Sequence, residues 1–321
     1  MNDVRLDEVQ SHKHLGITIS KTLEWSEHIE NIVAKANQCL NVLSGLKYKL
    51  DRKTLETLYF AFIRSKLEYA CIVWDNCTKE QKDLVESVQY RAAKIVSGGI
   101  HRTSHDVLYN ELGWETLEAR RKKQRLSTFY KMTTNDAPSY LQGILPTRSA
   151  HNLRNPSNFT IPKCRTVQFL DSFLPQTVRD WNQLSDATKH STSLESFKTK
   201  LNSNLQNVPS WYYKGDRKYS IMHARLRMSC SPLNSHLYNL AHIVQNPACA
   251  CGFTKETSKH FIFECPLYYN ERNILLQSLR DLNFTITEKN MLFGSKDYTE
   301  EKNCKAFLAF QQYLKETQRF D

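Results

Sequence analysis

The sequence predicts a mostly α-helical protein with a short β lead-in and a small C-terminal helical region built around cysteine and histidine residues. Three observations support this fold class. Apolar residues recur at helical spacing along most of the 321-residue chain. Glycine is scarce, with nine residues, which argues against a β-barrel, a β-sandwich or a phosphate-cradling loop protein. One short segment, residues 14–19, instead alternates β-branched residues as a strand does.

Residues that commonly begin helices predict where the elements of the first part of the chain start. Residues 1–20 predict a β-hairpin or strand pair, in which Gly16 permits a close backbone approach. Ser26 and Asp51 are favourable N-cap residues, and each precedes an apolar stripe at helical spacing. The second stripe is broad enough to predict one helix buried between neighbours. It comprises Leu55, Leu58, Tyr59, Phe62, Ile63, Leu67, Ala70 and Trp74.

Three further helices are expected before residue 145. One stops at Gly98-Gly99, as helices often do at glycine. The next opens at a sequence resembling a capping box, residues 103–106, and ends at Gly113. The third covers residues 116–132. Together these signals predict a helical domain over residues 21–145.

The second half of the chain begins with a change of composition. Residues 146–170 are polar, basic and punctuated by prolines, with Arg154 and Pro156 among them, and they predict a linker or irregular segment. Helices resume over residues 173–184 and 194–205, so the linker with its helices extends over residues 146–210.

A second boundary at Pro209 opens the C-terminal domain, residues 211–321. Helices are expected near 223–228, over 266–282 and over 299–318. The last of these is expected to show Phe307, Leu308, Gln311 and Leu314 on one face.

Composition indicates a compartment and a class of partner. Nine cysteines are an odd number, and the first residues lack the apolar stretch of a signal peptide. A reducing, intracellular location, nuclear or cytoplasmic and not secreted, therefore fits best. No run of eighteen apolar residues predicts a membrane span. The net charge of +11 favours a nucleic-acid partner, and solubility alone is the alternative.

The most informative motif is Cys249, Cys251, His260 and Cys265, with the spacing Cys-x-Cys-x8-His-x4-Cys. A closed set of three thiolates and one imidazole is typical of a structural zinc site. The one-residue gap places the first two thiols on one side of an extended strand. His260 and Cys265 are expected to complete the site from the start of a following helix. The alternative is a set of buried free cysteines beside a surface histidine.

The densest basic run lies in the helix expected over residues 116–132. On a helix these side chains point in all directions, so some must lie over apolar neighbours. The run is expected either to contact nucleic-acid phosphates or to form a solvated helix face. Its members are Arg120, Arg121, Lys122, Lys123 and Arg125.

A second basic group is interleaved with aromatic residues. Rings beside cationic side chains suit single-stranded nucleic acid, whose bases stack and whose phosphates pair with cations. An ordinary aromatic core beside surface charge is the equal alternative. The cationic residues of the group are Lys214, Arg217, Lys218, Arg225 and Arg227.

Sequence patterns of known catalytic sites are absent. The chain contains no Asp-Asp pair of the kind that could contribute to a two-metal site for phosphoryl transfer. It also lacks a His-Glu-x-x-His pattern and a Gly-x-Ser-x-Gly nucleophile turn. We therefore expect no catalytic residue in this chain.

Read in order, several short motifs resemble the C-terminal part of the reverse transcriptase of jockey-like non-LTR retrotransposons. The matching motifs in the first two thirds are residues 11–18 (SHKHLGIT), 25–29 (WSEHI), 67–74 (LEYACIVW), 112–121 (LGWETLEARR), 137–141 (APSYL), 172–173 (SF), 181–184 (WNQL) and 196–198 (SFK). Those in the last third are residues 225–227 (RLR), 233–237 (LNSHL), 249–252 (CACG), 256–257 (ET), 260–261 (HF) and 265–266 (CP).

The resemblance implies an architecture for this chain. Leu15 and Gly16 match the turn at the end of the palm that supports the primer terminus. Residues 21–145 would be the thumb, and residues 211–321 would carry the zinc knuckle. In that family the catalytic aspartates precede the Leu-Gly turn, and this chain begins just before the turn.

The function implied is therefore non-catalytic binding of RNA or DNA through a basic thumb and a CCHC zinc knuckle. Two alternatives stay open: the accessory half of a split polymerase, and a protein-interaction scaffold derived from a retrotransposon. The sequence does not indicate an oligomeric state.

Overall fold

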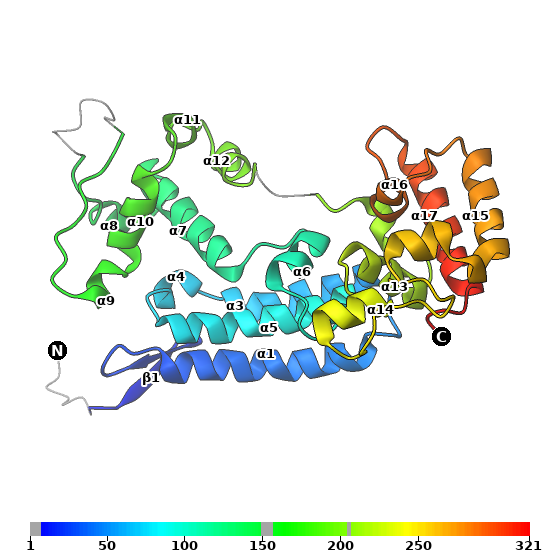
Figure 1. Ribbon diagram of the computed structural model, residues 1–321. Helices are drawn as coiled ribbons and strands as arrows, with labels where there is room; N and C mark the ends of the chain where they lie inside the picture. Colours follow the sequence, from blue (N-terminus) through cyan, green and yellow to red (C-terminus); the bar gives the residue numbers. More distant parts are fainter. Residues whose placement is uncertain (1–7, 149–156, 204–206) are drawn as a thin grey trace, which may run out of the picture. The chain divides into compact units, whose positions relative to one another are not determined.

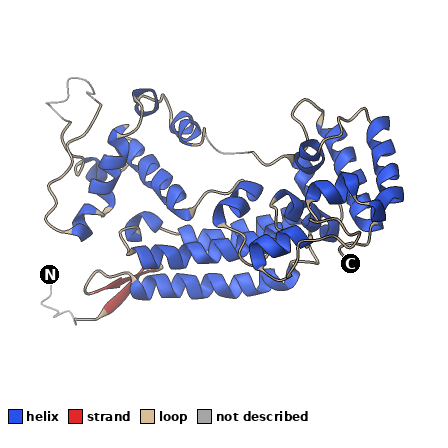
Figure 2. Cartoon of the chain, in the orientation of Figure 1, coloured by secondary structure: helices blue, strands red, loops and turns tan. Residues whose placement is uncertain are grey.

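A computed structural model describes residues 8–148, 157–203 and 207–321 (Figure 1). The predicted features that fall on residues 1–7, 149–156 and 204–206, among them Arg154 and Pro156 of the expected linker, lie outside the described residues. The described chain is mostly helical and has one two-stranded sheet near its start (Figure 2). The predicted fold class is thus confirmed.

The sheet is an antiparallel hairpin of β1 (Ser11–His14) and β2 (Ile17–Ser20), with Ser11 opposite Ser20 and His14 opposite Ile17. Leu15 and Gly16 form its two-residue turn with φ values of 45° and 86°. Positive φ at both central residues is the geometry that favours tight hairpins, and glycine adopts it at little cost. The hydroxyl of Tyr69 donates to the Leu15 carbonyl at 2.7 Å, which holds the turn in place.

Helices make up most of the remaining structure. The first half contains α1 (Ser26–Leu46), α2 (Arg52–Leu58), the π-helical η1 (Tyr59–Arg64), α3 (Ser65–Glu68), α4 (Cys71–Trp74), α5 (Lys79–Ser97), α6 (His105–Leu112), α7 (Leu117–Thr133) and α8 (Ser139–Gln142). The second half contains α9 (Val167–Leu170), α10 (Phe173–Asn182), α11 (Asp186–Lys189), α12 (Leu194–Leu201), the 3-10 turn η2 (Ser210–Tyr213), α13 (Arg217–Arg227), α14 (Asn234–His236), η3 (Leu237–Ala241), η4 (His260–Glu264), η5 (Pro266–Tyr268), α15 (Tyr269–Asp281), α16 (Glu288–Phe293) and α17 (Glu300–Glu316).

Two of the three predicted N-caps are confirmed by hydrogen bonds. The third prediction is wrong, because Ser26 is already the first residue of α1 and the Ile29 N–H donates to the Trp25 carbonyl. Asp51 accepts from the Thr54 N–H at the start of α2, and Ser104 accepts from Val107 at the start of α6. Thr116 likewise accepts from the Ala119 N–H and begins α7. Gly113 ends α6 in the left-handed conformation, with φ of 64°. Local sequence therefore determines these boundaries, because each cap satisfies a backbone group that the helix leaves unpaired.

The prediction of a single long helix after Asp51 is wrong. The chain forms α2, widens into the π-helical η1, and then breaks after α3 where Ala70 adopts a left-handed φ of 46°. The π-turn rotates the side chains that follow it relative to those of α2. Phe62 is therefore 55% exposed, although Tyr59 and Ile63 of the same apolar stripe are buried. The indole of Trp74 donates to the Tyr69 carbonyl at 3.1 Å across the break.

Two expectations for the later helices also need correction. The helix expected near residues 223–228 begins earlier, at Arg217, because Asp216 caps it by accepting from the Lys218 N–H. In α17, Leu308 lies off the buried face and is 47% exposed, whereas Phe307 and Leu314 are buried.

The chain divides into two compact units, each discontinuous in sequence. Unit 1 contains Met1–Asn37, Ile63–Gln89 and Glu115–Leu205, of which residues 1–7, 149–156 and 204–205 are not described. One apolar cluster of unit 1 joins α7, α10 and α12. Aromatic rings dominate this core; for example, Phe129 and Phe159 pack edge-to-face with ring centroids 5.2 Å apart. The buried members are Leu126, Phe129, Tyr130, Phe159, Val178, Trp181 and Phe197.

Unit 2 contains Gln38–Phe62, Tyr90–Trp114 and Gln206–Asp321, where residue 206 is not described. Within it α15 and α17 lie side by side (Figure 1) and pack with α13 and α16. The buried core comprises Leu226, Leu233, Phe261, Ile262, Leu275, Leu279, Phe284, Met291, Leu292, Ala306, Phe310, Tyr313, Leu314 and Phe320. Phe261 and Ile262 belong to the short turn η4, which links this core to the Cys/His motif.

Acid is expected to destabilise unit 2 through His223. Its Nε2 lies 3.0 Å from the Met291 carbonyl, Nδ1 is buried without a hydrogen-bond partner, and burial lowers the pKa of His223 well below its usual value. The neutral ring is therefore required in the folded state, whereas the unfolded chain binds a proton below about pH 6.5. Stability is fully present above that pH and falls below it, with a slope of up to about 1.4 kcal/mol per pH unit for this one group.

Urea denaturation between pH 7.5 and 5 measures this slope. His223→Gln should flatten it, whereas His101→Gln, which changes an exposed histidine of the same unit, should leave it unchanged. Equal slopes in wild type and His223→Gln would contradict the assignment.

Candidate metal centre

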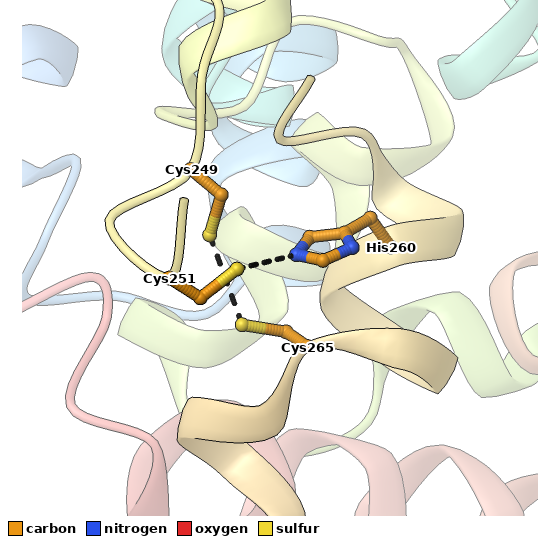
Figure 3. A group of neighbouring side chains, drawn as sticks. All are labelled: Cys249, Cys251, His260 and Cys265. Carbon is orange, nitrogen blue, oxygen red and sulfur yellow. Dashed lines mark hydrogen bonds between the residues drawn. The ribbon is translucent and has the colours of Figure 1, made fainter. Parts of the chain in front are cut away.

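Four side chains predicted to bind metal come together in unit 2. The potential ligand atoms of Cys249, Cys251, His260 and Cys265 all lie within 4.8 Å of one another (Figure 3). The Sγ atoms of Cys249 and Cys265 are 3.7 Å apart, and Sγ of Cys251 is 3.3 Å from Nε2 of His260. Tetrahedral zinc with ordinary bond lengths would place two thiolates about 3.8 Å apart and a thiolate and an imidazole nitrogen about 3.6 Å apart. The four residues therefore lie close enough to bind one metal ion.

The first two ligands lie in a tight turn, so the expected extended strand is wrong here. The Gly252 N–H donates to the Cys249 carbonyl at 3.0 Å, and the Cys249 N–H donates to the Phe253 carbonyl at 2.9 Å. Gly252 has a φ of 92°, which favours glycine over any residue with a side chain. The turn, and not an extended strand, brings the two sulfur atoms together.

The other two ligands are His260, the first residue of η4, and Cys265, the residue that follows η4, where the sequence predicted the start of an ordinary helix. The Cys265 N–H donates to the His260 carbonyl at 2.8 Å, an i to i+5 bond that defines a π-turn. In an α-helix, residues five apart are roughly 140° apart around the axis, at about 100° per residue. The wider turn reduces this offset and allows His260 and Cys265 to face the same point.

Neighbouring groups fix the orientation of His260, which is only 2% exposed. The alternative prediction of a surface histidine is therefore wrong. Its ring stacks on Phe253 with centroids 4.4 Å apart, and Nε2 faces Cys251. Nδ1 is buried and lies 3.7 Å from a carboxylate oxygen of Glu264. This distance is too long for a hydrogen bond, although Glu264 lies on the side where metal-binding histidines commonly direct the second ring nitrogen to a carboxylate.

Two residues of the core helices donate hydrogen bonds to backbone carbonyls of η4 and Cys265. Arg272 of α15 donates to the carbonyl oxygens of Ile262, at 2.9 Å, and of Cys265. The hydroxyl of Tyr313 in α17 donates to the Phe261 carbonyl at 2.7 Å. The ligand-bearing turn is thus attached to the hydrophobic core by both backbone and side-chain contacts.

The thiols differ in their local electrostatics. Burial raises the pKa of Cys265 to about 12, and burial also raises that of Cys249. The pKa of Cys251 is lowered, first by a hydrogen bond from the Phe253 backbone N–H. Three sulfur atoms and one imidazole are a donor set that suits zinc and other thiophilic metals.

The basic run of α7 is placed among carboxylates of unit 1. Arg121 and Arg125 are buried, and both pair with Asp75, with 2.6 Å between Nε of Arg121 and the carboxylate. Arg125 also pairs with Asp180 at 2.9 Å, and Lys122 pairs with the same carboxylate at 2.8 Å. The other two cations are paired as well, Arg120 with Glu68 and Lys123 with Glu115.

The second basic group is divided among several structural roles in unit 2. Arg227 is buried and donates to Glu111 at 2.6 and 3.0 Å, and Arg52 donates to the same carboxylate at 2.7 Å. Burial alone would raise the pKa of Glu111, but the two guanidinium groups outweigh it and lower that pKa. Lys214 is exposed.

Arg217 and Arg225 of α13 bind backbone carbonyls instead. Arg217 donates to the carbonyls of Lys47, Ile95 and Val96, each at 2.9 Å, near the ends of α1 and α5. Arg225 donates to the Gly98 carbonyl at 2.7 Å. No local sequence pattern distinguishes a buried ion-pair partner from a surface charge, so the roles of Glu111, Arg52 and Asp75 were not predictable from the sequence.

The fold and the site together define a mostly helical protein with a Cys3His cluster able to hold a metal ion. No protein-family model matches the chain, and no solved structure matches it. The chain is similar to a Drosophila melanogaster protein described as "Probable RNA-directed DNA polymerase from transposon BS". The two are 24% identical over 124 residues, which is 37% of this chain and 13% of that protein.

This similarity supports a relation to the reverse transcriptase of a retrotransposon. The matched segment is a small part of that polymerase, 13% of its length. Across the described part of the chain, no helix has the length and apolar character needed to span a lipid bilayer.

Proposed function

We propose that this chain is a nucleic-acid-holding region of a jockey-like non-LTR retrotransposon reverse transcriptase, with a thumb-like helical part and a C-terminal zinc knuckle. The Cys3His cluster is the observation that carries the proposal, since its four donors surround one point in a basic chain that is similar to a transposon polymerase. We assign no catalytic step to the chain.

Zinc is the metal proposed for the cluster. It would supply a structural cross-link between the turn at Cys249 and Cys251 and the π-turn at His260 and Cys265, with Glu264 orienting the imidazole. Such a cross-link leaves no open coordination position, so its role is to present the surrounding surface and not to activate water.

RNA or DNA is the proposed partner. The net charge is +11, and contacts would be made mainly to phosphates, which give affinity without sequence readout. Arg121, Arg125 and Arg227 have internal carboxylate partners, so the contacts are proposed for exposed or half-buried cations such as Lys214.

The functional regions proposed from the resemblance follow the chain order. Residues 1–20 correspond to the end of the palm, residues 21–145 to the thumb, residues 146–210 to a linker with helices, and residues 211–321 to the knuckle domain. Leu15 and Gly16 are proposed to support a primer terminus, which is consistent with their tight turn at the tip of the hairpin.

A binding titration tests the nucleic-acid proposal. Zinc-loaded full chain is titrated against labelled single-stranded RNA and DNA oligonucleotides at two salt concentrations. We expect binding that weakens as salt rises, because cations released from the nucleic acid drive the association. Absent or salt-insensitive binding would instead favour the protein-interaction scaffold.

A third possibility is that the chain is the accessory half of a split polymerase. In that case, adding the purified chain to a fingers–palm protein of the family should increase primer extension. No gain in extension rejects complementation and leaves the binding proposal unaffected.

A further inference from the structure

A pocket of about 330 Å³ lies within unit 2, where the ends of α1 and α5 meet α13. Its size is at the lower end of the range of about 300–1,000 Å³ that small-molecule sites occupy. Four of its lining side chains carry a positive charge, namely Lys47, Arg91, Lys94 and Arg225, and none of the lining residues, all of which the structure describes, is acidic. We call this site the Arg225 pocket.

The cations of the Arg225 pocket differ from the buried arginines elsewhere in this protein. Arg52 and Arg227 share the carboxylate of Glu111. In the described residues, by contrast, Lys47, Lys94 and Arg225 form no ion pair. Lys94 lies 4.5 Å from the centre of the Tyr90 ring, and Lys47 lies 4.6 Å from that of Tyr48. Half-buried cations that lack an internal anion are left to pair with an external one.

Backbone geometry brings Arg225 into this position. Gly98 has a φ of 77°, and a Cβ there would lie 2.6 Å from a side-chain carbon of Ile221. The absence of that Cβ lets α13 pack closely on the end of α5. Nε of Arg225 is then held by the Gly98 carbonyl at 2.7 Å. Burial lowers the pKa of Arg225, yet an arginine stays protonated in a protein, so its charge persists without a carboxylate.

The helix ends at this place would by themselves repel an anion, because the C-terminal end of a helix carries a partial negative charge. Arg217 offsets this effect, since its guanidinium group already binds the carbonyls of Lys47, Ile95 and Val96. The lysine and Arg225 charges beside it are thus available to a ligand.

Aromatic rings at the pocket indicate which class of molecule would bring an anionic group to it. Tyr48 lines the pocket and is 65% exposed, and the exposed His101 lines it as well. Stacking of a base on such a ring is worth roughly 1–3 kcal/mol and does not depend on the base. Cations in a pocket beside an exposed ring therefore match a phosphate with a nucleobase next to it.

We propose that the Arg225 pocket binds a phosphate group of a single-stranded nucleic acid, with the adjacent base stacked on Tyr48. This inference rests on the proposed nucleic-acid function and assigns one specific contact to it. A free nucleoside triphosphate offers the same chemistry and is distinguished by the experiment.

The test is fluorescence anisotropy of a labelled single-stranded RNA oligonucleotide with the full zinc-loaded chain. Lys94→Gln and Lys47→Gln should each weaken binding roughly fivefold and reduce the salt slope of log K by about 0.7, the value for one phosphate contact on a single strand. Tyr48→Ala should weaken binding by a similar factor with an unchanged slope, and Tyr48→Phe should bind like wild type.

Lys289→Gln is the matched control, because it removes an exposed lysine charge of the same unit far from the lining residues in sequence. If the three pocket variants bind like this control while wild type binds RNA, the pocket assignment is overturned and the proposed function stands.

If wild type binds no oligonucleotide, the proposed function fails, and thermal denaturation with ATP decides the fate of the pocket. A rise in Tm that is lost in Lys94→Gln would assign the pocket to a free nucleotide. No rise in Tm would overturn the phosphate site altogether.

Discussion

Cys265→Ser, or removal of the metal by a chelator, is expected to unfold residues 249–265 and to destabilise the core of unit 2. Structural zinc contributes apparent binding energies of about 10–16 kcal/mol in small zinc-finger peptides, where binding and folding are coupled. In a larger core the loss is smaller, and we expect at least about 4 kcal/mol, the range in which loss of a metal stands out among substitutions.

The physical reason lies in the positions of the ligands. Cys265 is fully buried and follows the π-turn whose residues Phe261 and Ile262 lie in the core. Without the ion, the turn at Cys249 has no covalent or coordinate link to η4. The contacts that remain near the cluster are weak: two sulfur atoms 3.7 Å apart, Sγ of Cys251 at 3.3 Å from Nε2 of His260, and the stacking of Phe253 on the His260 ring.

Metal analysis and hydrogen exchange measure this outcome. Purified wild-type protein should hold one metal ion per chain, and chelation should remove exchange protection from residues 249–265 and lower Tm. Cys304→Ser is the control, because Cys304 is a half-buried cysteine of unit 2 outside the cluster. A metal content well below one per chain, unchanged by His260→Ala, would reject the site.

Glu111→Gln is expected to destabilise unit 2 by about 3–5 kcal/mol, the usual cost of removing one partner from a buried ion pair. Glu111 is the carboxylate that Arg52 and Arg227 share, and the side chains of all three are 4% exposed or less. The amide keeps the shape of the side chain but leaves two buried guanidinium groups without a counter-charge.

Chemical denaturation of matched variants tests this cause. Glu301→Gln, which breaks an exposed pair with Lys305, should leave the free energy of unfolding close to that of wild type. The triple variant Arg52→Met, Glu111→Leu and Arg227→Met removes charge on both sides and should be less destabilised than Glu111→Gln alone. A loss below about 1 kcal/mol in Glu111→Gln would show that Glu111 does not provide the counter-charge.

The sequence predicted the metal cluster because all of its ligands lie within one short segment. The spacing was sufficient to group Cys249, Cys251, His260 and Cys265, and the structure brings them within 4.8 Å of one another. The local geometry was not predictable in the same way. A turn at Gly252 and a π-turn at η4 replace the expected strand and helix start, because several backbone paths satisfy one ligand spacing.

The roles of the basic residues depend on partners distant in sequence. Arg121 pairs with a carboxylate 46 residues away, and Arg227 with one 116 residues away. A count of nearby charges therefore cannot separate a buried ion pair from a phosphate-binding side chain. Helix caps such as Asp51 were predictable for the opposite reason, since their partner lies three residues away.

Engineering a metal-free version of this chain would meet a constraint set by η4. Phe261 and Ile262 occupy the core while the residues on either side of their turn hold the ligands. Inserting or deleting one amino acid there would rotate these apolar side chains toward solvent as well as misplace a donor atom. A redesign would have to fill the space between the four cluster side chains with packed apolar groups. It would also have to preserve the length of that loop, because one short stretch of backbone serves both purposes.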